Sequence, residues 1–304
     1  MRLSIRPATP RDKEAVLAFC RETWGWGDYI PLVWDRWLAD PSGRLLVAAR
    51  GQEPIGLARV RFLGTAEAWL EGLRVAPQER KGGVAGRLTA RCLKIAQDQG
   101  ARVVRFVTMS TNLPVHRLAA QFGFRRAAGF SIYQAPASPG EEVPLRQASP
   151  QDWERLKGLL RSPLFRAWGG LYAQDWSYRR LNSPQLRERL EAGEVFILAS
   201  KGRAQFMAIV RPGEEALEVN YLDGEALEVN YLDGEALEEG ARALRDLAAV
   251  RQLPLVRAHL PDIAPLKQAF EKAGYQSAWE GQLWVFELVL GAAHGGRPAG
   301  CQAR

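Results

Sequence analysis

The sequence predicts an α/β (α+β) protein in which one fold occurs twice in tandem. Three observations lead to this prediction. At 304 residues the chain is long for one hydrophobic core and comfortable for two. An apolar strand, residues 68–75, runs through a glycine-rich turn into an amphipathic helix, residues 84–99. The two halves of the chain also begin and end with matching patterns.

A strand followed by a capped helix is expected at the start of each half. Residues 5–12 read IRPATPRD and residues 145–152 read LRQASPQD, so both follow the order apolar, Arg, any residue, Ala, hydroxyl, Pro, any residue, Asp. Thr9 and Ser149 are of the type that accepts hydrogen bonds from the first amides of a helix. We therefore expect a first strand and an N-capped helix in both halves.

The ends of the two halves match as well. In the first half a buried strand, residues 103–107, precedes a helix that ends in Gly123-Phe124. In the second half residues 256–257 precede Gly274-Tyr275 at nearly the same spacing. Apolar closing strands are expected at residues 130–135 and 283–288. Duplication of one fold is the simplest explanation.

The turn before the first long helix reads RKGGVAG, residues 80–86. A glycine-rich turn at a helix start offers unpaired N–H groups and the positive end of the helix dipole, and Arg80 and Lys81 add two cations. The segment therefore indicates a pyrophosphate site, with a purely structural surface turn as the alternative. It has neither the Lys-Ser/Thr of a P-loop nor the Gly-x-Gly-x-x-Gly of a dinucleotide fold.

This segment resembles the acyl-CoA loop of the GCN5-related N-acetyltransferases (GNAT), in which Arg or Gln, then Gly, then Gly or Ala mark three positions. Arg80, Gly83 and Ala85 occupy them here. The preceding strand, Asn112 after the next strand and the Gly-Phe ending follow in the family's order. Residues 1–136 thus resemble a GNAT domain. The resemblance implies that each half is a mixed, mostly antiparallel twisted sheet flanked by helices.

The expected domain organisation follows from the composition around these patterns. The linker is rich in Pro, Ser and Gly, and the tail is rich in Gly and Ala. The expected parts are a catalytic GNAT domain at residues 1–136, a linker at 137–143, a degenerate GNAT-like domain at 144–290 and a mobile tail at 291–304.

The second half lacks the chemistry of the phosphate loop. Residues 233–242 read DGEALEEGAR, and four carboxylates at a helix start suit the dipole but repel a pyrophosphate. We expect no CoA binding there. Just before, EALEVNYLDG at 215–224 is copied as residues 225–234. An insertion of ten residues, an even number, keeps the same side chains on the core face of a strand, and the Asp-Gly between the copies favours a turn. We therefore expect an extra hairpin or a bulged strand pair. A replication slip without function is the favoured origin of the repeat.

The resemblance implies an acetyl-CoA-dependent N-acetyltransferase in which an amine attacks the thioester directly in a ternary complex. Acyl transfer needs an unprotonated amine, a stabilised carbonyl oxygen and a proton for the leaving thiolate. Similar enzymes stabilise the oxygen with N–H groups at the end of the fourth strand, which also pairs with the pantetheine arm. The residues assigned in this way to acetyl-CoA, the co-substrate, are Leu73, Arg74, Val75, Arg80, Lys81, Gly82, Gly83, Val84, Ala85, Gly86 and Asn112.

Glu71 is the first candidate for the general base. It shares strand parity with Trp69 and Leu73, and burial among such neighbours would raise its pKa toward useful values. Glu67 is the reserve candidate and would act through water. A solvated strand carboxylate is the alternative for both.

The general acid is not identified. The resemblance places a Tyr where this chain has Ala119, so the usual proton donor is missing. His116, Tyr29 and Tyr133 could substitute, although spacing favours none of them.

The acceptor amine is expected at the loop after the first helix, residues 24–34, which reads WGWGDYIPLVW. Trp26, Asp28 and Tyr29 are the candidate substrate residues, because a carboxylate among aromatic rings attracts an ammonium group. The loop and the appended second half look similar to an amino-acid-acetylating branch of the family. A small amine or an amino acid is therefore favoured over a protein as acceptor. Trp34 and Trp37, one turn apart, are expected in the core.

Other classes of function are less well supported. The formal charge of +7 is spread over short basic tracts, so no nucleic-acid partner is expected. No run approaches 18 apolar residues and no signal peptide is evident, which predicts no membrane association and a cytoplasmic location. Three dispersed cysteines predict no metal site. A monomer or homodimer is expected, and a non-catalytic acyl-CoA-binding or regulatory protein is the alternative function.

Overall fold

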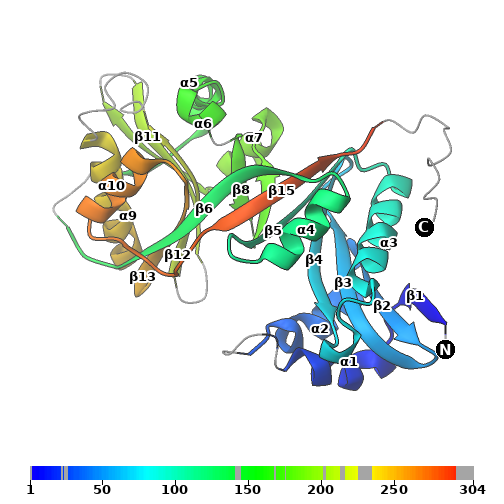
Figure 1. Cartoon of the computed structure of the whole chain (residues 1–304). Helices are drawn as coiled ribbons and strands as arrows, with labels where there is room; N and C mark the ends of the chain where they lie inside the picture. The colour runs from blue at the N-terminus through cyan, green and yellow to red at the C-terminus, as the bar shows by residue number, and fades with distance from the viewer. Residues whose placement is uncertain are drawn as a thin grey trace. The chain divides into compact units, whose positions relative to one another are not determined.

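The structure is a computed structural model of the whole chain (Figure 1). It describes residues 2–21, 23, 27–140, 145–167, 169–174, 176–200, 203–212, 216–224 and 235–291. These residues form two compact units, described in turn below. The first unit comprises the chain up to Phe106, His116–Arg125 and the residues from Glu287 onward; the second comprises Val107–Val115 and Arg126–Phe286. The expected boundaries along the chain stay a prediction, and the expected tail from residue 292 lies outside the described residues.

The first unit is built on a sheet with the strand order β1-β2-β3-β4-β5. Neighbouring strands are antiparallel except β4 and β5, which are parallel. The predicted strand at 68–75 and helix at 84–99 are confirmed as β4 and α3. The elements, some of whose residues count with the second unit, are β1 (Leu3–Pro7), η1 (Pro10–Asp12), α1 (Lys13–Cys20), α2 (Ile30–Ala39), β2 (Gly43–Arg50), β3 (Glu53–Phe62), β4 (Glu67–Val75), η2 (Pro77–Glu79), α3 (Val84–Asp98), β5 (Val103–Met109) and α4 (Leu113–Gln121).

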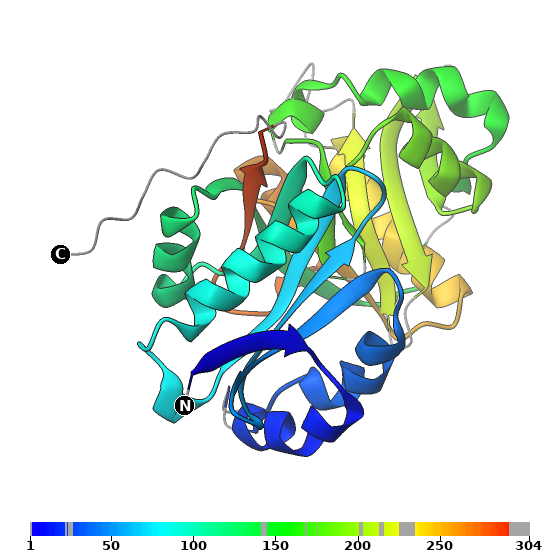
Figure 2. The same ribbon diagram turned by 90° about the vertical axis from the view of Figure 1, so that its right-hand side faces the viewer.

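Helices cover both faces of this sheet. On one face α1 and α2 form a buried cluster with β2 and β3 that includes Trp34, Trp37 and Leu57, which confirms the two tryptophans as core residues. Gly56 precedes Leu57 and therefore faces the other way. A Cβ on Gly56 would lie 3.0 Å from Val84, so α3 covers the second face at close approach (Figure 2).

A β-bulge interrupts β4 at Gly72. The neighbouring strand β3 pairs Arg59 with Glu71 but Leu57 with Arg74, so β4 carries one residue more than β3 over this stretch. Gly72 has φ +68°, a conformation that favours glycine. A Cβ there would also lie 2.6 Å from the ring of an α2 tryptophan, Trp37.

The bulge corrects one expectation about Glu71. Before the bulge, Glu71 and Trp69 share a face of the sheet, as predicted. Beyond it, the extra residue reverses the alternation, so Arg74 and not Leu73 lies on the face of Glu71. Sequence parity missed this because it assumes a regular strand.

The parallel strands β4 and β5 are paired over only three residue pairs. The register begins at Glu67 with Val103 and ends at Trp69 with Arg105. β4 nevertheless continues to Val75. Within the described part of the chain, the ladder between β4 and β5 therefore ends at Trp69, and β4 runs beyond it without strand pairing to β5.

The second unit has the strand order β6-β13-β12-β11-β10-β7, with β14 also paired to β6. The cluster of α9 and α10 with β11 and β13 includes Phe206, Leu244 and Phe270. The hairpin β8-β9 stands apart as a separate pair. The elements are β6 (Arg125–Pro136), β7 (Arg146–Gln147), η3 (Pro150–Asp152), α5 (Trp153–Leu159), α6 (Pro163–Ala167), β8 (Leu171–Gln174), β9 (Ser177–Arg180), α7 (Ser183–Glu191), β10 (Val195–Ser200), β11 (Arg203–Pro212), β12 (Ala216–Gly224), α9 (Glu235–Val250), β13 (Leu255–Pro261), α10 (Ala264–Lys272), β14 (Gln276–Ser277) and β15 (Leu283–Val289), whose last residues count with the first unit.

The predicted duplication is visible in matching helix starts. Thr9 and Ser149 each form a capping box with the Asp three residues later, which confirms the expected N-caps. Each of these two Asp carboxylates also forms a bidentate ion pair with an arginine of the preceding strand. Arg6 lies 2.7 Å from Asp12 (Nη2 to Oδ1), and Arg146 lies 2.6 Å from Asp152.

The helix ends match in the same way. Gly123 and Gly274 each follow a helix, and both have a positive φ, +79° and +87°. The next amide then returns to the helix, from Phe124 to the Ala119 carbonyl and from Tyr275 to the Phe270 carbonyl, at 3.0 Å in both cases. Glycine is needed at both positions because an L side chain rarely adopts this backbone conformation.

The first copy of the ten-residue repeat supplies β12, which pairs antiparallel with β11 and parallel with β13. The second copy, residues 225–234, lies outside the described residues, so the expected hairpin stays a prediction. The helix that follows it is α9.

Other features of the described residues bear on the excluded classes. Cys20 and Cys92 are both buried and free. The described residues hold no group of three metal-binding side chains. None of their helices has the length and hydropathy needed to cross a bilayer.

Candidate functional site

The turn between β4 and α3 has backbone geometry suited to an anion. Lys81 and Gly83 have φ +64° and +77°, so left-handed residues flank Gly82. Such alternation turns successive N–H groups toward a common point, and Lys81 is a residue that rarely takes this conformation. The first helical hydrogen bond of α3 runs from the Arg87 amide to the Gly83 carbonyl at 3.1 Å. The earlier amides of α3 therefore have no acceptor one turn before them.

Charge around the turn is positive. Glu79, the last residue of η2, is paired with Arg50 at 2.9 Å between Oε2 and Nη2, and that hydrogen bond lowers the pKa of its carboxyl. Arg80 and Lys81 are exposed, and Arg80 Nε lies 3.4 Å from the Val75 carbonyl. The predicted residues 80–86 are thus gathered at one helix start and fit a diphosphate.

Glu71 lies in a network of arginines on the face covered by α2. Its carboxylate accepts a hydrogen bond from Arg59, which is 2% exposed and also contacts Asp40. Arg61 Nε lies 3.7 Å from Glu71 Oε1. Burial raises the pKa of Glu71, while the guanidinium groups of Arg61, Arg59 and Arg36 oppose the shift.

Sequence reasoning missed these partners of Glu71. Arg59 and Arg61 flank the buried Val60 in β3, and two arginines at i and i+2 in a largely apolar strand were the available signal. Arg59 also stacks on Trp37, with its Cζ 5.0 Å from the ring centroid.

Glu67, the reserve base, is held by a buried arginine. Arg105 on β5 is 3% exposed and contacts Glu67 Oε2 at 3.2 Å and Glu287 Oε2 at 2.7 Å. Glu67 and Glu71 share a face of β4, because both precede the bulge and lie four residues apart. The structure thus brings both predicted carboxylates to one face, each in contact with an arginine.

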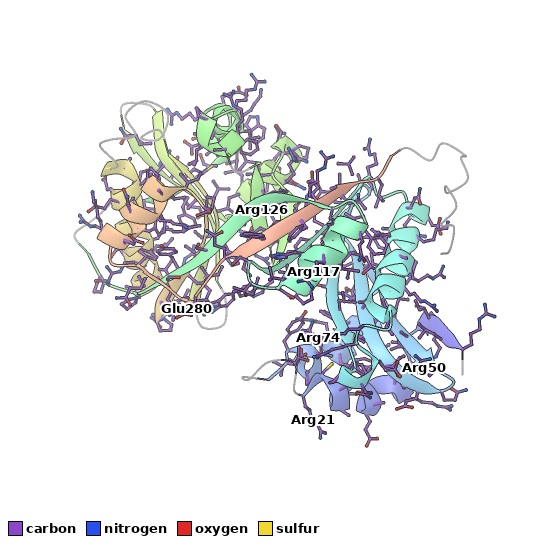
Figure 3. The ribbon with its side chains drawn as sticks, viewed as in Figure 1. Arg21, Arg50, Arg74, Arg117, Arg126 and Glu280 are labelled. Atoms are coloured by element: carbon purple, nitrogen blue, oxygen red, sulfur yellow. The ribbon has the colours of Figure 1, made fainter. Side chains whose placement is uncertain are left out.

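The acceptor-side residues differ from expectation in one respect. Asp28 is 1% exposed and binds the side chain of Arg74 through both oxygens, at 2.7 and 3.1 Å. The charge of Asp28 is therefore compensated inside the protein, which does not fit the expected role of binding an ammonium group. Tyr29 packs edge-on against Trp37 and lies under the guanidinium of Arg74, the residue labelled in Figure 3. Trp26 lies outside the described residues.

The remaining predicted residues occupy separate surroundings. Asn112 precedes α4 and donates from Nδ2 to Thr108 Oγ1 at 3.0 Å. Ala119 is buried in α4 and supplies no proton donor. Tyr133 donates to Glu271 at 2.8 Å, and burial raises the pKa of its hydroxyl to about 12. Tyr133 belongs to the core of the second unit and is a poor substitute for the missing acid.

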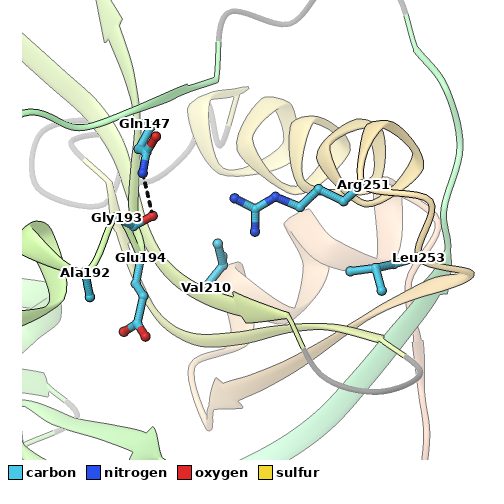
Figure 4. Close-up of a pocket in the computed structure, with 7 residues that line it drawn as sticks. All are labelled: Gln147, Ala192, Gly193, Glu194, Val210, Arg251 and Leu253. Atoms are coloured by element: carbon cyan, nitrogen blue, oxygen red, sulfur yellow. Dashed lines mark hydrogen bonds between the residues drawn. The ribbon is translucent and has the colours of Figure 1, made fainter.

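A hollow of about 550 Å³ in the second unit is lined by Gln147, Ala192, Gly193, Glu194, Val210, Arg251 and Leu253 (Figure 4). Two of its polar side chains already have partners within the protein. Gln147 binds the Gly193 carbonyl at 2.9 Å, and Glu194 is paired with Arg189 and Arg211. None of the predicted site residues lines it.

Comparison with known proteins finds similarity to the same family over part of the chain. Residues 13–124 match the model of the acetyltransferase (GNAT) family. A human protein named "Probable N-acetyltransferase 16" is 41% identical over 101 residues, which are 32% of this chain and 27% of that protein. Histidine N-acetyltransferase of Oreochromis niloticus is 35% identical over 98 residues, 32% of this chain and 29% of that protein. The chain thus spans less than a third of the length of these relatives.

Solved structures resemble nearly the whole chain. A GCN5-related N-acetyltransferase from Sphaerobacter thermophilus superposes with a TM-score of 0.65 at 14% identity, over 94% of this chain and 95% of that one. A tandem GNAT protein from the clavulanic acid biosynthesis pathway gives a TM-score of 0.54 at 15% identity, over 96% and 100%. At these identities the likeness concerns the fold. The chain has a tandem GNAT-like fold, and its residues 13–124 match the model of the GNAT acetyltransferase family.

Proposed function

We propose that this chain is an acetyl-CoA-dependent N-acetyltransferase that acts on a primary amine of a small molecule or an amino acid. The observation that carries the proposal is the end of β4. Its pairing with β5 stops at Trp69, and a left-handed glycine, Gly72, then redirects the strand beside Glu71. On this side of β4, beyond Trp69, an extended ligand would pair with the main-chain N–H and C=O groups of the strand.

Acetyl-CoA supplies the activated acyl group, and the protein supplies position and charge. Residues 80–86 would hold the diphosphate through main-chain N–H groups and through Arg80 and Lys81. The outward groups of Leu73, Arg74 and Val75 would pair with the pantetheine arm and donate N–H groups to the carbonyl oxygen. Asn112 is retained as a further CoA contact.

Glu71 is proposed to take the proton of the acceptor ammonium, directly or through water. The free amine then forms a bond to the acetyl carbon, the carbon–sulfur bond breaks, and the sulfur leaves as a thiolate. Because Ala119 replaces the usual donor, the thiolate would receive its proton from solvent. Glu67 stays the second candidate for the base.

Calorimetry with acetyl-CoA, followed by an assay of thiol release with a panel of amines and amino acids, tests the proposal. We expect binding and amine-dependent thiol release. The buried Ala119 favours one alternative, a non-catalytic acyl-CoA-binding protein. Binding without turnover on any amine, peptides included, would support that alternative, and no binding would exclude both.

A further inference from the structure

Two arginines of β3 contact Glu71, and they differ in how many partners they have. Arg59 contacts Asp40 and Glu71 and stacks on Trp37. Arg61 has one contact among the described residues, the 3.7 Å ion pair to Glu71, and its Nε is buried without a hydrogen-bond partner there. The Arg61 side chain is 20% exposed, so its guanidinium can still be reached from solvent.

The two arginines that contact Glu71 differ in their carboxylate partners. Arg59 is shared between Asp40 and Glu71, whereas Arg61 has only the 3.7 Å ion pair to Glu71 among the described residues. A buried guanidinium nitrogen without an acceptor is costly, and a carboxylate carried by a ligand would satisfy the guanidinium.

We propose that Arg61 binds a carboxylate carried by the acceptor next to its reactive amine, so that the substrate is an α-amino acid rather than a simple amine. This inference rests on the proposed function. In an α-amino acid the amine nitrogen and the carboxyl carbon are both bonded to the α-carbon and lie about 2.5 Å apart. Glu71 and Arg61 are adjacent, so one such molecule can reach both. The planar guanidinium matches a carboxylate in a bidentate manner.

The test compares α-amino acids with their α-amides, which keep the amine and lose the negative charge. For the full chain with acetyl-CoA, kcat/KM is expected to favour the acid by about 10-fold or more, typical of losing a charged hydrogen-bond partner. In Arg61→Gln the ratio of acid to amide should fall toward one. Arg61→Lys keeps the positive charge but loses the planar group that binds a carboxylate through two hydrogen bonds, so it should give an intermediate ratio of acid to amide.

Arg91→Gln is the matched control, because Arg91 is an exposed arginine on α3, the helix on the other face of the sheet. The Arg91→Gln variant should keep the wild-type ratio of kcat/KM between acid and amide. Circular dichroism of each variant checks folding. Equal kcat/KM for acid and amide in the wild type, or an unchanged ratio in Arg61→Gln, would overturn the inference and leave the transferase proposal standing.

Calorimetric titration of the CoA-bound protein with the same acids and amides gives a readout that needs no turnover. Tighter binding of the acid, lost in Arg61→Gln, supports the carboxylate site even if no acyl transfer occurs. In that case the proposed function fails and the carboxylate site remains. Equal binding of acid and amide would reject the site.

Discussion

At the scale of single residues, the protonation state of Glu71 is set by two opposing effects. Burial favours the neutral acid, whereas Arg61, Arg59 and Arg36 favour the carboxylate. The net shift is upward, so the pKa of Glu71 lies above that of a solvated glutamate. A base with a raised pKa accepts a proton more readily than an exposed carboxylate.

Glu71→Gln is therefore expected to lower kcat by about 10²- to 10⁴-fold, the usual contribution of a general base. The affinity for acetyl-CoA should change little, because the side chain is not among the proposed CoA contacts. In the wild type, kcat/KM should rise with pH through the raised pKa of Glu71, and this rise should be absent in the variant. Steady-state kinetics against pH measure both effects.

Glu67→Gln is the comparison for this experiment. Glu67 lies on the same face of β4 but is held by Arg105. If Glu67→Gln loses the rise in kcat/KM while Glu71→Gln keeps it, the base is Glu67. If both keep it, solvent accepts the proton.

The turn before α3 makes a second prediction at this scale. Arg80→Ala combined with Gly83→Asp should abolish detectable acetyl-CoA binding, because one cation is lost and a carboxylate and a strained left-handed residue are added. Both residues are exposed, so the protein should remain folded. Calorimetry measures the affinity, and Arg91→Ala should bind like the wild type. Unchanged affinity in the double variant would place the diphosphate elsewhere.

At the scale of elements, the bulge in β4 depends on Gly72. Gly72→Ala should destabilise the protein by about 1–3 kcal/mol, because Ala is strained at φ +68° and its Cβ would lie 2.6 Å from Trp37. Acyl transfer should fall as well, since Leu73 and its amide would move. Urea unfolding and thiol release measure the two effects.

Gly100→Ala separates backbone strain from the clash. Gly100 has φ +81°, but nothing lies within 4 Å of its missing Cβ. Its variant should show only the smaller cost of the left-handed conformation, about 1 kcal/mol. Equal destabilisation of the two variants would mean that the contact with Trp37 does not matter.

The two capping boxes predict how the free energy of unfolding depends on pH. The hydrogen bond from Arg6 lowers the pKa of Asp12, and Arg146 has the same effect on Asp152. A carboxyl with a lowered folded pKa stabilises the protein above its unfolded pKa, near 3.9. That contribution is lost as the pH falls through the folded value. The free energy of unfolding should therefore decrease below about pH 4.

Asp12→Asn should cost about 1–2 kcal/mol at pH 7 and weaken this dependence on acid. Denaturation by urea at pH 7 and at about pH 3 measures both quantities. Asp35→Asn is the control, because Asp35 forms an exposed pair with Lys13 that contributes little. An Asp12→Asn variant as stable as this control would contradict the expected role of the box.

At the scale of the whole molecule, the first unit depends on a residue from the far end of the chain. Glu287 contacts the buried Arg105, and the Leu290 amide donates to the Arg102 carbonyl at 2.8 Å. A fragment limited to residues 1–136 would lack these partners. We therefore expect the full chain to be needed for a stable first unit.

Glu287→Gln should destabilise the full chain by about 1–3 kcal/mol, because Arg105 would keep only one carboxylate in a buried position. Glu280→Gln changes an exposed glutamate and should stay within about 0.5 kcal/mol of the wild type (Figure 3). Thermal or urea unfolding measures the difference. Equal stability of the two variants would show that Arg105 does not need Glu287.

Local patterns in the sequence determined a large part of this protein. The repeated Arg-x-Ala-hydroxyl-Pro-x-Asp segments predicted both capped helices, and the glycine-rich turn after β4 predicted the start of α3. These features depend on residues within one turn of a helix or one strand. Their physics is local, so a single sequence is enough to find them.

Only the tertiary structure decided the surroundings of the candidate base and acceptor loop. Glu71 contacts Arg59 and Arg61, and Arg59 also contacts Asp40, because β3, β4 and the end of α2 converge. Arg74 binds Asp28, which lies 46 residues away in the sequence. The bulge at Gly72 also changed which side chains share a face. Contacts between distant segments depend on register and packing, which the spacing of residues along the chain does not encode.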